Sequence, residues 1–551
     1  MLSVCYYLHK ESFSLYLLYQ EDQTVKNISR RDFLKGSAAS ALSLALLGGS
    51  QMAFADGEKE ASAPVAADET LETPILIVGA GSAGMMAAYE ASKAGAQVLV
   101  ISNSPSANAT NGASITGTCA VETPYTEEIG QEYSLDDLYK RMISFAHWTV
   151  NPRLLKNCVQ LLPGNISTFA DMGIEVMLAG DRYGIGFNDV HIFLTQGKWA
   201  LAEQKCKDQG VEFMYNMTAE EPLMDGDTVI GIRAVDNDGK IYDIKAKAVL
   251  LACGGFISSK EKLKEHFGDI DIVDMGFPYN TGKGIEVAQK AGGFFERITG
   301  LGMNDIYGMN AKSSRISVFN SNPLMQLAFY GNLITDEHGD RFMNEYMLAN
   351  EPMAGGGEAT LHVKRYYCIY NEATLMKMKD EAYYQTIGAP EFWTSAATMF
   401  NAPIAELDAN LEEALAEGWC YKADTLEELA EMTGCENLAE TVRTYDTYVA
   451  AGDDPVYHKQ PALMQPIGEE GPFYLFEYNP SAFNTFGGCR TDHLTRALKS
   501  NFDVIPGLYI AGVENGSLYS SPYYDVGGTC SGLALASGRL AGMEMVKYIA
   551  E

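Results

Sequence analysis

The sequence predicts an α/β protein built on a parallel sheet, and residues 74–102 carry the features that indicate this fold class. Ile75–Val78 and Val98–Ile101 are short apolar runs, typical of strands buried on both faces of a parallel sheet. A helical pattern from Met85 to Lys93 lies between them, preceded by a glycine-rich stretch. A strand, a helix and a second strand in this order predict a βαβ unit.

The glycine-rich stretch has the pattern Gly-x-Gly-x-x-Gly, formed by Gly79, Ala80, Gly81, Ser82, Ala83 and Gly84. We expect Gly79 to make a tight turn, Gly81 to let the backbone approach a pyrophosphate, and Gly84 to let helix and strand pack closely. The free N–H groups at the start of the helix would then face the phosphates. Within a complete βαβ unit, this pattern predicts a Rossmann-like dinucleotide site.

The acidic residue that usually ends the second strand and binds a ribose is missing. Ser102 and Asn103 occupy its place. Because a hydroxyl and an amide can also bond to ribose hydroxyls, both residues are predicted to bind the cofactor.

Composition limits the classes of function. The 551 residues suffice for two or three domains, and the net charge of −32 argues against nucleic-acid binding. The ten cysteines include no Cys-x-x-Cys pair, so the sequence predicts no metal site and no attached haem. We expect most of them to be buried as small apolar side chains.

The first 55 residues predict a twin-arginine (Tat) signal peptide. Ser29–Lys35 contains the arginine pair, Gly36–Gly49 is a short apolar segment, and Ala53–Ala55 is a cleavage site. We expect translation to begin near Val25, and residues 56–72 to form a polar linker. The mature protein would then lie in the periplasm or at the extracytoplasmic face, without an integral membrane segment.

The chain after the βαβ unit has regular elements and a small-residue loop. Ser104–Gly117 suits a loop along a flat cofactor, with Asn111, Gly112 and Ala113 as binding candidates, and its lack of histidine argues against a covalent histidyl link. We expect helices within 135–172 and from 197, a strand at 211–215, and a hairpin of 229–235 with 241–244. A buried strand over 245–253 ends at the cofactor-binding candidates Ala252, Gly254 and Gly255.

Four motifs give the chain a resemblance to the FAD-binding flavoproteins of the fumarate reductase/succinate dehydrogenase group. They are Gly79–Gly84, Lys247–Phe256, Thr281–Ile285, and Gly507–Gly512 with the later pair Gly527-Gly528. The resemblance implies non-covalent FAD and adds Gly512, Glu514, Gly528 and Thr529 to the binding residues. It also implies a two-part FAD domain (73–302 and 486–551) interrupted by an α+β capping domain (303–485).

The catalytic positions of fumarate reductases do not carry over. The family's proton-donor arginine corresponds to Ala349, and its relay residues correspond to Met325 and Ala328. Asn484 stands where the family has a substrate-binding histidine, and the carboxylate-clamping arginine falls near Tyr523 or Asp525. Because a buried dicarboxylate needs paired cations, we do not expect fumarate to be the preferred substrate. Arg315 and Arg490 remain alternative anchors.

In place of the clamp, Tyr523 and Gly527 resemble an arrangement in flavin-dependent ketosteroid dehydrogenases, where a tyrosine O–H and a glycine N–H polarise a ketone. We expect the same pair to bind a substrate carbonyl here and to stabilise an enolate after hydride transfer from flavin N5. Tyr330 is either the acid that completes the reduction or a packed core tyrosine. Asn484, Tyr524 and Asp525 are substrate-binding candidates, although the last two can also serve FAD or the fold.

Together these features predict an exported FAD-dependent oxidoreductase that reduces the C=C bond of an α,β-unsaturated carbonyl compound or acid, in anaerobic respiration. Electrons would come from a separate cytochrome or flavoprotein, because the chain has one dinucleotide pattern and no haem-binding segment. Two alternatives stay open: a ketosteroid-type dehydrogenase that runs the reaction in reverse, and a non-catalytic flavin electron carrier.

Overall fold

The structure is a computed structural model that describes residues 66–179, 189–303, 309–315, 321–350, 355–388, 402–404, 406–521 and 523–551. The predicted signal peptide and cleavage site lie outside these residues. Residues 67–551 form one compact unit. No helix of the described part is both long and apolar enough to cross a membrane.

The predicted βαβ unit is confirmed: β1 (Glu69–Val78) pairs in parallel with β2 (Val98–Ile101), and α3 (Ser82–Lys93) connects them. The helix begins at Ser82, three residues before the predicted start at Met85. The predicted linker 56–72 is too long, because β1 already begins at Glu69 and pairs there with a later strand. Main-chain pairing thus places these polar residues in the sheet.

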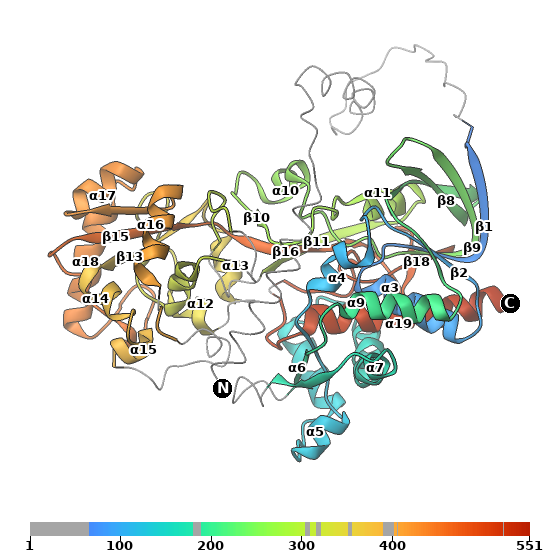
Figure 1. Cartoon of the computed structure of the whole chain (residues 1–551), viewed down its shortest axis with the longest axis horizontal. Helices are drawn as coiled ribbons and strands as arrows, with labels where there is room; N and C mark the ends of the chain where they lie inside the picture. Colours follow the sequence, from blue (N-terminus) through green and yellow to red (C-terminus); the bar gives the residue numbers. More distant parts are fainter. Residues whose placement is uncertain are drawn as a thin grey trace, which may run out of the picture. The chain divides into compact units, whose positions relative to one another are not determined.

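The central sheet has the order β17-β18-β9-β1-β2-β6, with β7 and β8 added through β9 (Figure 1). The predicted strands 241–244 and 245–253 are one continuous strand, β9. Its first half pairs with β8, its second half pairs with β18, and β1 pairs with both halves. The C-terminal β18 thereby completes a sheet begun near residue 69, and the predicted α/β, two-part fold is confirmed. The remaining strands of this sheet are β6 (Glu212–Met214), β7 (Met217–Asp225), β8 (Thr228–Asp236), β9 (Ile241–Leu251), β17 (Arg496–Leu498) and β18 (Val504–Ile510).

Both faces of this sheet are covered. Alternate residues of β1 belong to different cores: Ile75 and Ile77 to one, Leu76 and Val78 to the other. This division explains why the strand is a continuous apolar run rather than an alternating one.

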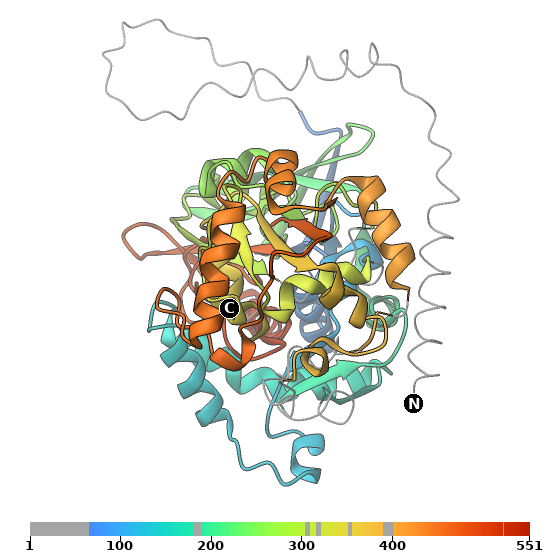
Figure 2. The same cartoon turned by 90° about the vertical axis from the view of Figure 1, so that its left-hand side faces the viewer.

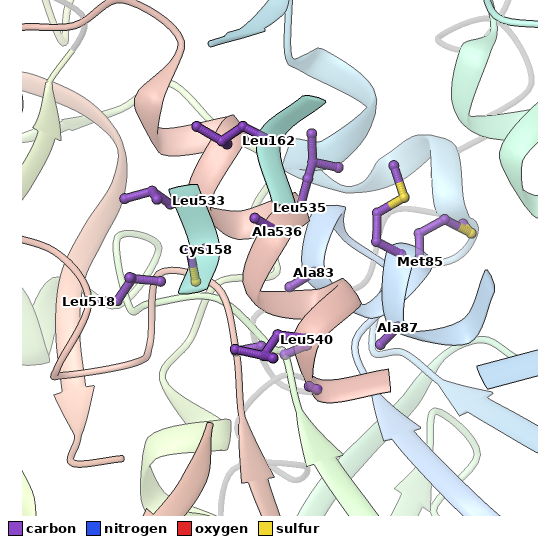
Figure 3. Close-up of a cluster of buried hydrophobic side chains, with 14 of the residues drawn as sticks. Ala83, Met85, Ala87, Cys158, Leu162, Leu518, Leu533, Leu535, Ala536 and Leu540 are labelled. Carbon is purple, nitrogen blue, oxygen red and sulfur yellow. The ribbon is translucent and has the colours of Figure 1, made fainter. Parts of the chain in front are cut away.

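On one face, the C-terminal helix α19 (Thr529–Ala550) packs against α3 and α7 (Pro152–Asp171). Figure 3 shows Ala83 and Ala87 of α3 beside Leu535, Ala536 and Leu540 of α19. Gly538 and Gly542 let the helices approach closely, since a Cβ at either position would overlap the backbone of α3.

The helical pattern of residues 135–172 forms two helices, α6 (Leu135–Phe145) and α7. They are separated where His147 and Trp148 have positive φ and where Asn151 caps α7 with Pro152 in its first turn. The other elements of this part are α4 (Asn111–Ser114), β3 (Gly117–Cys119), α5 (Pro124–Glu128), β4 (Val176–Leu178), β5 (Val190–Phe193), α9 (Lys198–Asp208), α10 (Lys260–Phe267) and α11 (Lys283–Lys290).

Residues 324–478 build a second sheet with its own aromatic-rich core. Its strands follow the order β12 (Ile334–Asp336), β13 (Tyr366–Asn371), β15 (Phe473–Tyr478) and β14 (Cys420–Ala423). Figure 2 views the yellow and orange helices of this part: α12 (Tyr346–Asn350), α13 (Gly357–Thr360), α14 (Glu372–Lys377), α15 (Tyr383–Thr386), α16 (Leu407–Glu417), α17 (Leu426–Thr433) and α18 (Leu438–Ala451). Before and after this segment, β11 (Phe295–Met303) and β16 (Ser481–Cys489) pair antiparallel, and β16 also pairs with β10 (Val273–Asp274).

Candidate cofactor and substrate site

The glycine-rich turn between β1 and α3 is open on one side and closely packed on the other. A Cβ on Gly79 or Gly84 would overlap the carbonyl oxygens of Ala252 and Gly79, respectively, whereas a Cβ on Gly81 would meet nothing within 4 Å. Gly81 caps α3 without a side-chain hydrogen bond, and the first turn has no acidic residue. The N–H groups of Ser82, Ala83 and Gly84 can therefore face an anion, beside the buried Ala80.

Ser102 and Asn103, at the end of β2, are bonded to protein partners. Ser102 Oγ lies 2.8 Å from Ser104 Oγ, and Asn103 Nδ2 donates to the Tyr279 carbonyl at 2.8 Å. These bonds fix the strand end, and a ribose contact by either side chain stays a prediction.

Asn111 joins three segments that are remote in sequence. Its Nδ2 donates to Phe483 O and to Asn484 Oδ1 at 3.0 Å, and its Oδ1 accepts the N–H of Phe277. The predicted residues Asn111 and Asn484 thus lie together. Asn484 Nδ2 in turn lies 3.9 Å from Cys530 Sγ, in the first turn of α19.

Gly112 and Ala113 contact α3 and α9. A Cβ on Gly112 would lie 2.8 Å from both Ser82 N and the Trp199 indole, and Ala113 O accepts a bond from Lys198 Nζ at 2.7 Å. Burial lowers the pKa of Lys198 to about 8. No ion pair involves this lysine within the described residues. The sequence alone did not single out Lys198 as a site residue, because it is an isolated lysine at a helix start.

Glu514 is a buried carboxyl beside the end of β9. Its Oε1 accepts the backbone N–H of Cys253, while Oε2 has no partner within the described chain. Burial raises its pKa to about 8, against the lowering effect of the Cys253 and Gly254 N–H groups. A Cβ on Gly284 would overlap Oε2, so glycine is needed there.

Other predicted glycines make close backbone contacts around this carboxyl. Gly254 has φ of 80° and Gly512 has φ of 79°, and the Gly512 N–H donates to Ser537 Oγ at 3.0 Å. A Cβ on Gly255 would overlap Thr485. Ala252 is buried behind them.

The predicted catalytic pair, Tyr523 and Gly527, lies just before α19. Gly528 precedes the helix with φ of 73° and no side-chain cap, and Thr529 Oγ1 donates to Val526 O at 2.6 Å. Tyr523 is buried and its hydroxyl oxygen accepts the backbone N–H of Cys530. Its ring stacks on Phe486 of β16 at 5.3 Å between centroids. Gly527 faces the Val190 side chain.

A scan against known protein families matches residues 74–530 to the FAD binding domain. The chain belongs to the FAD binding domain family. Residues 27–46 match the twin-arginine translocation signal, so this flavoprotein carries a Tat export signal.

Curated relatives span most of the flavoprotein. It is 26% identical over 492 residues to the vinyl phenol reductase of Lactiplantibacillus plantarum, covering 86% of this chain and 96% of the relative. It is 25% identical to the fumarate reductase (cytochrome) of Shewanella frigidimarina, covering 90% and 81%. Among solved structures, the 3-ketosteroid Δ1-dehydrogenase of Sterolibacterium denitrificans superposes with a TM-score of 0.62 at 16% identity, covering 86% of this chain and 99% of that one, which shows the fold alone.

The flavoprotein's own residues fit FAD. The open side of Gly81 and the uncapped start of α3 suit a pyrophosphate, and the unpartnered Glu514 Oε2 suits a cofactor hydroxyl. The family match shows that the flavoprotein binds FAD, and Gly79–Gly84 and Glu514 stay the predicted residues that would hold it.

Two predicted substrate-binding residues, Tyr524 and Asp525, and the catalytic candidate Tyr330 have other partners in the structure. Tyr524 is buried and donates to Leu518 O at 3.0 Å, and Asp525 is exposed and pairs with Arg141 at 3.1 Å. Tyr330 stacks on Tyr383 at 5.0 Å within the core of residues 324–478, and its hydroxyl donates to Gln326. These contacts account for the three side chains as parts of the fold.

The two arginines considered as alternative carboxylate anchors are also engaged. Arg315 pairs with Glu413 at 2.7 Å, and Arg490 with Glu296 at 3.3 Å. A cation that the sequence did not single out is Arg297 of β11, which donates to the Thr149 carbonyl while its buried Nε has no partner in the described chain.

Proposed function

We propose that this flavoprotein reduces the C=C bond of an α,β-unsaturated carbonyl compound after export. It is an FAD-dependent oxidoreductase of the type that acts on CH–CH groups, as its curated relatives are. Reduced FAD supplies a hydride from N5 of its ring system. The protein must then hold the carbonyl oxygen and deliver a proton.

The observation that carries the proposal is Tyr523 in the loop before α19, whose hydroxyl reaches the first turn of that helix. Its oxygen accepts the Cys530 N–H, which polarises the O–H and makes it a better donor. Burial raises the pKa of Tyr523 well above its usual range, so the hydroxyl keeps its proton at neutral pH. A protonated donor in a dry site stabilises the negative charge that develops on a carbonyl oxygen.

The positions that correspond to fumarate reductase catalysts support a neutral substrate. Met325, Ala328 and Ala349 are all buried within an apolar core or beside it. A dicarboxylate would therefore lack these groups, and its two charges would be costly to bury. We propose that fumarate is a poor substrate.

An unsaturated monocarboxylic acid is the second candidate, and Arg297 favours it. This arginine has no acidic partner within the described residues, and its charge lowers the pKa of the neighbouring Tyr524 hydroxyl against the effect of burial. One cation near the loop of residues 517–524 suits one carboxylate.

We propose that a separate redox protein supplies the electrons, at the periplasmic or extracytoplasmic side. The Tat signal supports this location, because export removes the enzyme from the cytoplasmic nicotinamide pool. The single Gly-x-Gly-x-x-Gly pattern agrees with it.

The test is anaerobic stopped-flow of the chemically reduced protein with neutral enones, aryl acrylates and fumarate, followed by flavin absorbance. We expect fast reoxidation by an enone and a 10²- to 10³-fold slower reaction for Tyr523→Phe. Tyr519→Phe is the matched control, because Tyr519 also stacks on Phe486 but its hydroxyl donates to the Cys530 carbonyl. Fast reoxidation by fumarate would refute the proposal, and desaturation of a saturated ketone by the oxidised protein would reverse its direction.

A further inference from the structure

Reduction of a conjugated C=C bond needs a second acid, because the α-carbon must gain a proton after the hydride reaches the β-carbon. Tyr330 is not free for this task, since it lies in an aromatic core with its hydroxyl bonded to Gln326. The second acid must lie near Tyr523 but on another element. This inference rests on the proposed function.

Glu358 of α13 has the required chemistry. Its Oε1 accepts a hydrogen bond from Ser521 Oγ at 2.7 Å, across 163 residues of sequence. The carboxyl is partly buried, and no ion pair involves it within the described residues. A carboxyl without a cationic partner is more easily kept protonated than a paired one.

Gly300 of β11 lies beside both Ser521 and this carboxyl. A Cβ at this position would lie 3.2 Å from Ser521 Oγ and 3.5 Å from Glu358 Oε2. Strand β11 therefore contacts both the loop before α19 and the start of α13 at this position.

The same strand connects Glu358 to the candidate substrate site. Gly300 pairs with Phe486 of β16, and the Phe486 ring stacks against the Tyr523 ring. Two residues along β11, Gly302 pairs with Asn484. Ser521 itself is two residues before Tyr523. Glu358 thus contacts the loop that carries Tyr523, at Ser521, from an element of the other part of the chain.

The electrostatic surroundings favour a protonated Glu358. Burial raises its pKa, while the Ser521 hydroxyl and the charge of His362 lower it in part. His362 lies four residues later and is exposed. It therefore marks the solvent side of helix α13.

We propose that Glu358 is the catalytic acid that protonates the α-carbon of the substrate, with Ser521 as its positioning residue. A hydride forms the new C–H bond at the β-carbon, and the C=C electron pair shifts to the bond between the α-carbon and the carbonyl carbon. The C=O π pair then moves to the oxygen beside Tyr523. The enolate then reforms its C=O bond and takes the proton of the Glu358 carboxyl at the α-carbon. Glu358 is left as a carboxylate and regains a proton from solvent on the His362 side.

The test combines kinetics with a measurement that needs no turnover. Glu358→Gln keeps the acceptor for Ser521 and loses the proton, so we expect reoxidation by an enone to slow at least about 10²-fold. In infrared spectra of the flavin-free protein, the carboxylic-acid band, to which Glu514 also contributes, should lose intensity in Glu358→Gln. Glu381→Gln, which replaces an exposed carboxyl of the same part of the chain, should change neither property.

Ser521→Ala tests the positioning role through pH. Loss of this hydrogen bond removes an effect that lowers the pKa of Glu358, so the falling limb of the rate profile should move to higher pH. Wild-type rates with unchanged pH dependence in Glu358→Gln would overturn the inference alone. Absence of reoxidation of the wild-type protein by every enone and acid would overturn the proposed function and the inference with it.

Discussion

Replacing Glu514 with glutamine should change how the stability of the flavin-free protein depends on pH. The Glu514 carboxyl is 1% exposed, with Oε1 bonded to the Cys253 N–H and Oε2 unpartnered. Burial raises its pKa from 4.5 to about 8, so the folded protein keeps this proton over a range in which the unfolded chain has lost it. Unfolding then releases a proton, and the group's stabilising effect declines as the pH rises from about 4.5 to 8.

The size of the effect follows from the two pKa values. A rise from 4.5 to about 8 corresponds to about 5 kcal/mol of preference for the protonated form in the folded state. Between pH 5 and pH 8, the free energy of unfolding should therefore fall by about 3.5 kcal/mol because of this one group. Glutamine is neutral at both pH values, and its amide can still accept the Cys253 N–H.

The assay is urea unfolding of the flavin-free wild-type protein and of Glu514→Gln at pH 5 and at pH 8. All other titrating groups are common to both proteins, so the difference between their pH dependences isolates Glu514. Glu431→Gln controls for loss of an exposed carboxyl. Equal pH dependence in wild type and Glu514→Gln would refute the reasoning, because it would mean that Glu514 is ionised in the folded protein.

Three further substitutions test the glycine turn and the buried ion pairs of residues 324–478. Gly81→Ala should unfold like wild type but purify with less FAD per protein, measured by flavin absorbance, because its Cβ meets only open space on the predicted pyrophosphate side. Gly84→Ala should destabilise even the flavin-free protein by about 1–3 kcal/mol in urea, because its Cβ would overlap a backbone oxygen. Arg341→Met should cost about 3–5 kcal/mol, since it leaves the Glu345 and Asp454 carboxylates buried and without this partner. Burial alone would raise the pKa of Asp454, but the Arg341 bond and backbone N–H groups lower it to about 2. The contribution of Asp454 to stability is therefore present above pH 3.8 and lost toward pH 2. On acidification, Arg341→Met should unfold at a higher pH than wild type. An unchanged pH of acid unfolding would contradict this assignment.

The sequence by itself determined the βαβ unit, the export signal and the hairpin that leads into β9. These features depend on near neighbours: apolar periodicity, a glycine pattern and turn residues act over a few positions. The helix break near residue 150 was not predicted, although Asn151 and Pro152, which begin α7, are local signals of a helix start.

The tertiary structure alone decided the chemistry of the side chains. Glu514 was a binding candidate from its motif, but its unpartnered oxygen and raised pKa come from burial beside Cys253, which is 261 residues away in sequence. The sequence left Arg315 and Arg490 as possible anchors for a substrate carboxylate, whereas the structure pairs both with acidic side chains of the chain itself. Glu358 carried no sequence signal, and only the contact of α13 with the loop before α19 places it beside Ser521, two residues before Tyr523. Pairing and desolvation depend on neighbours that the fold supplies, so the order of residues along the chain cannot report them.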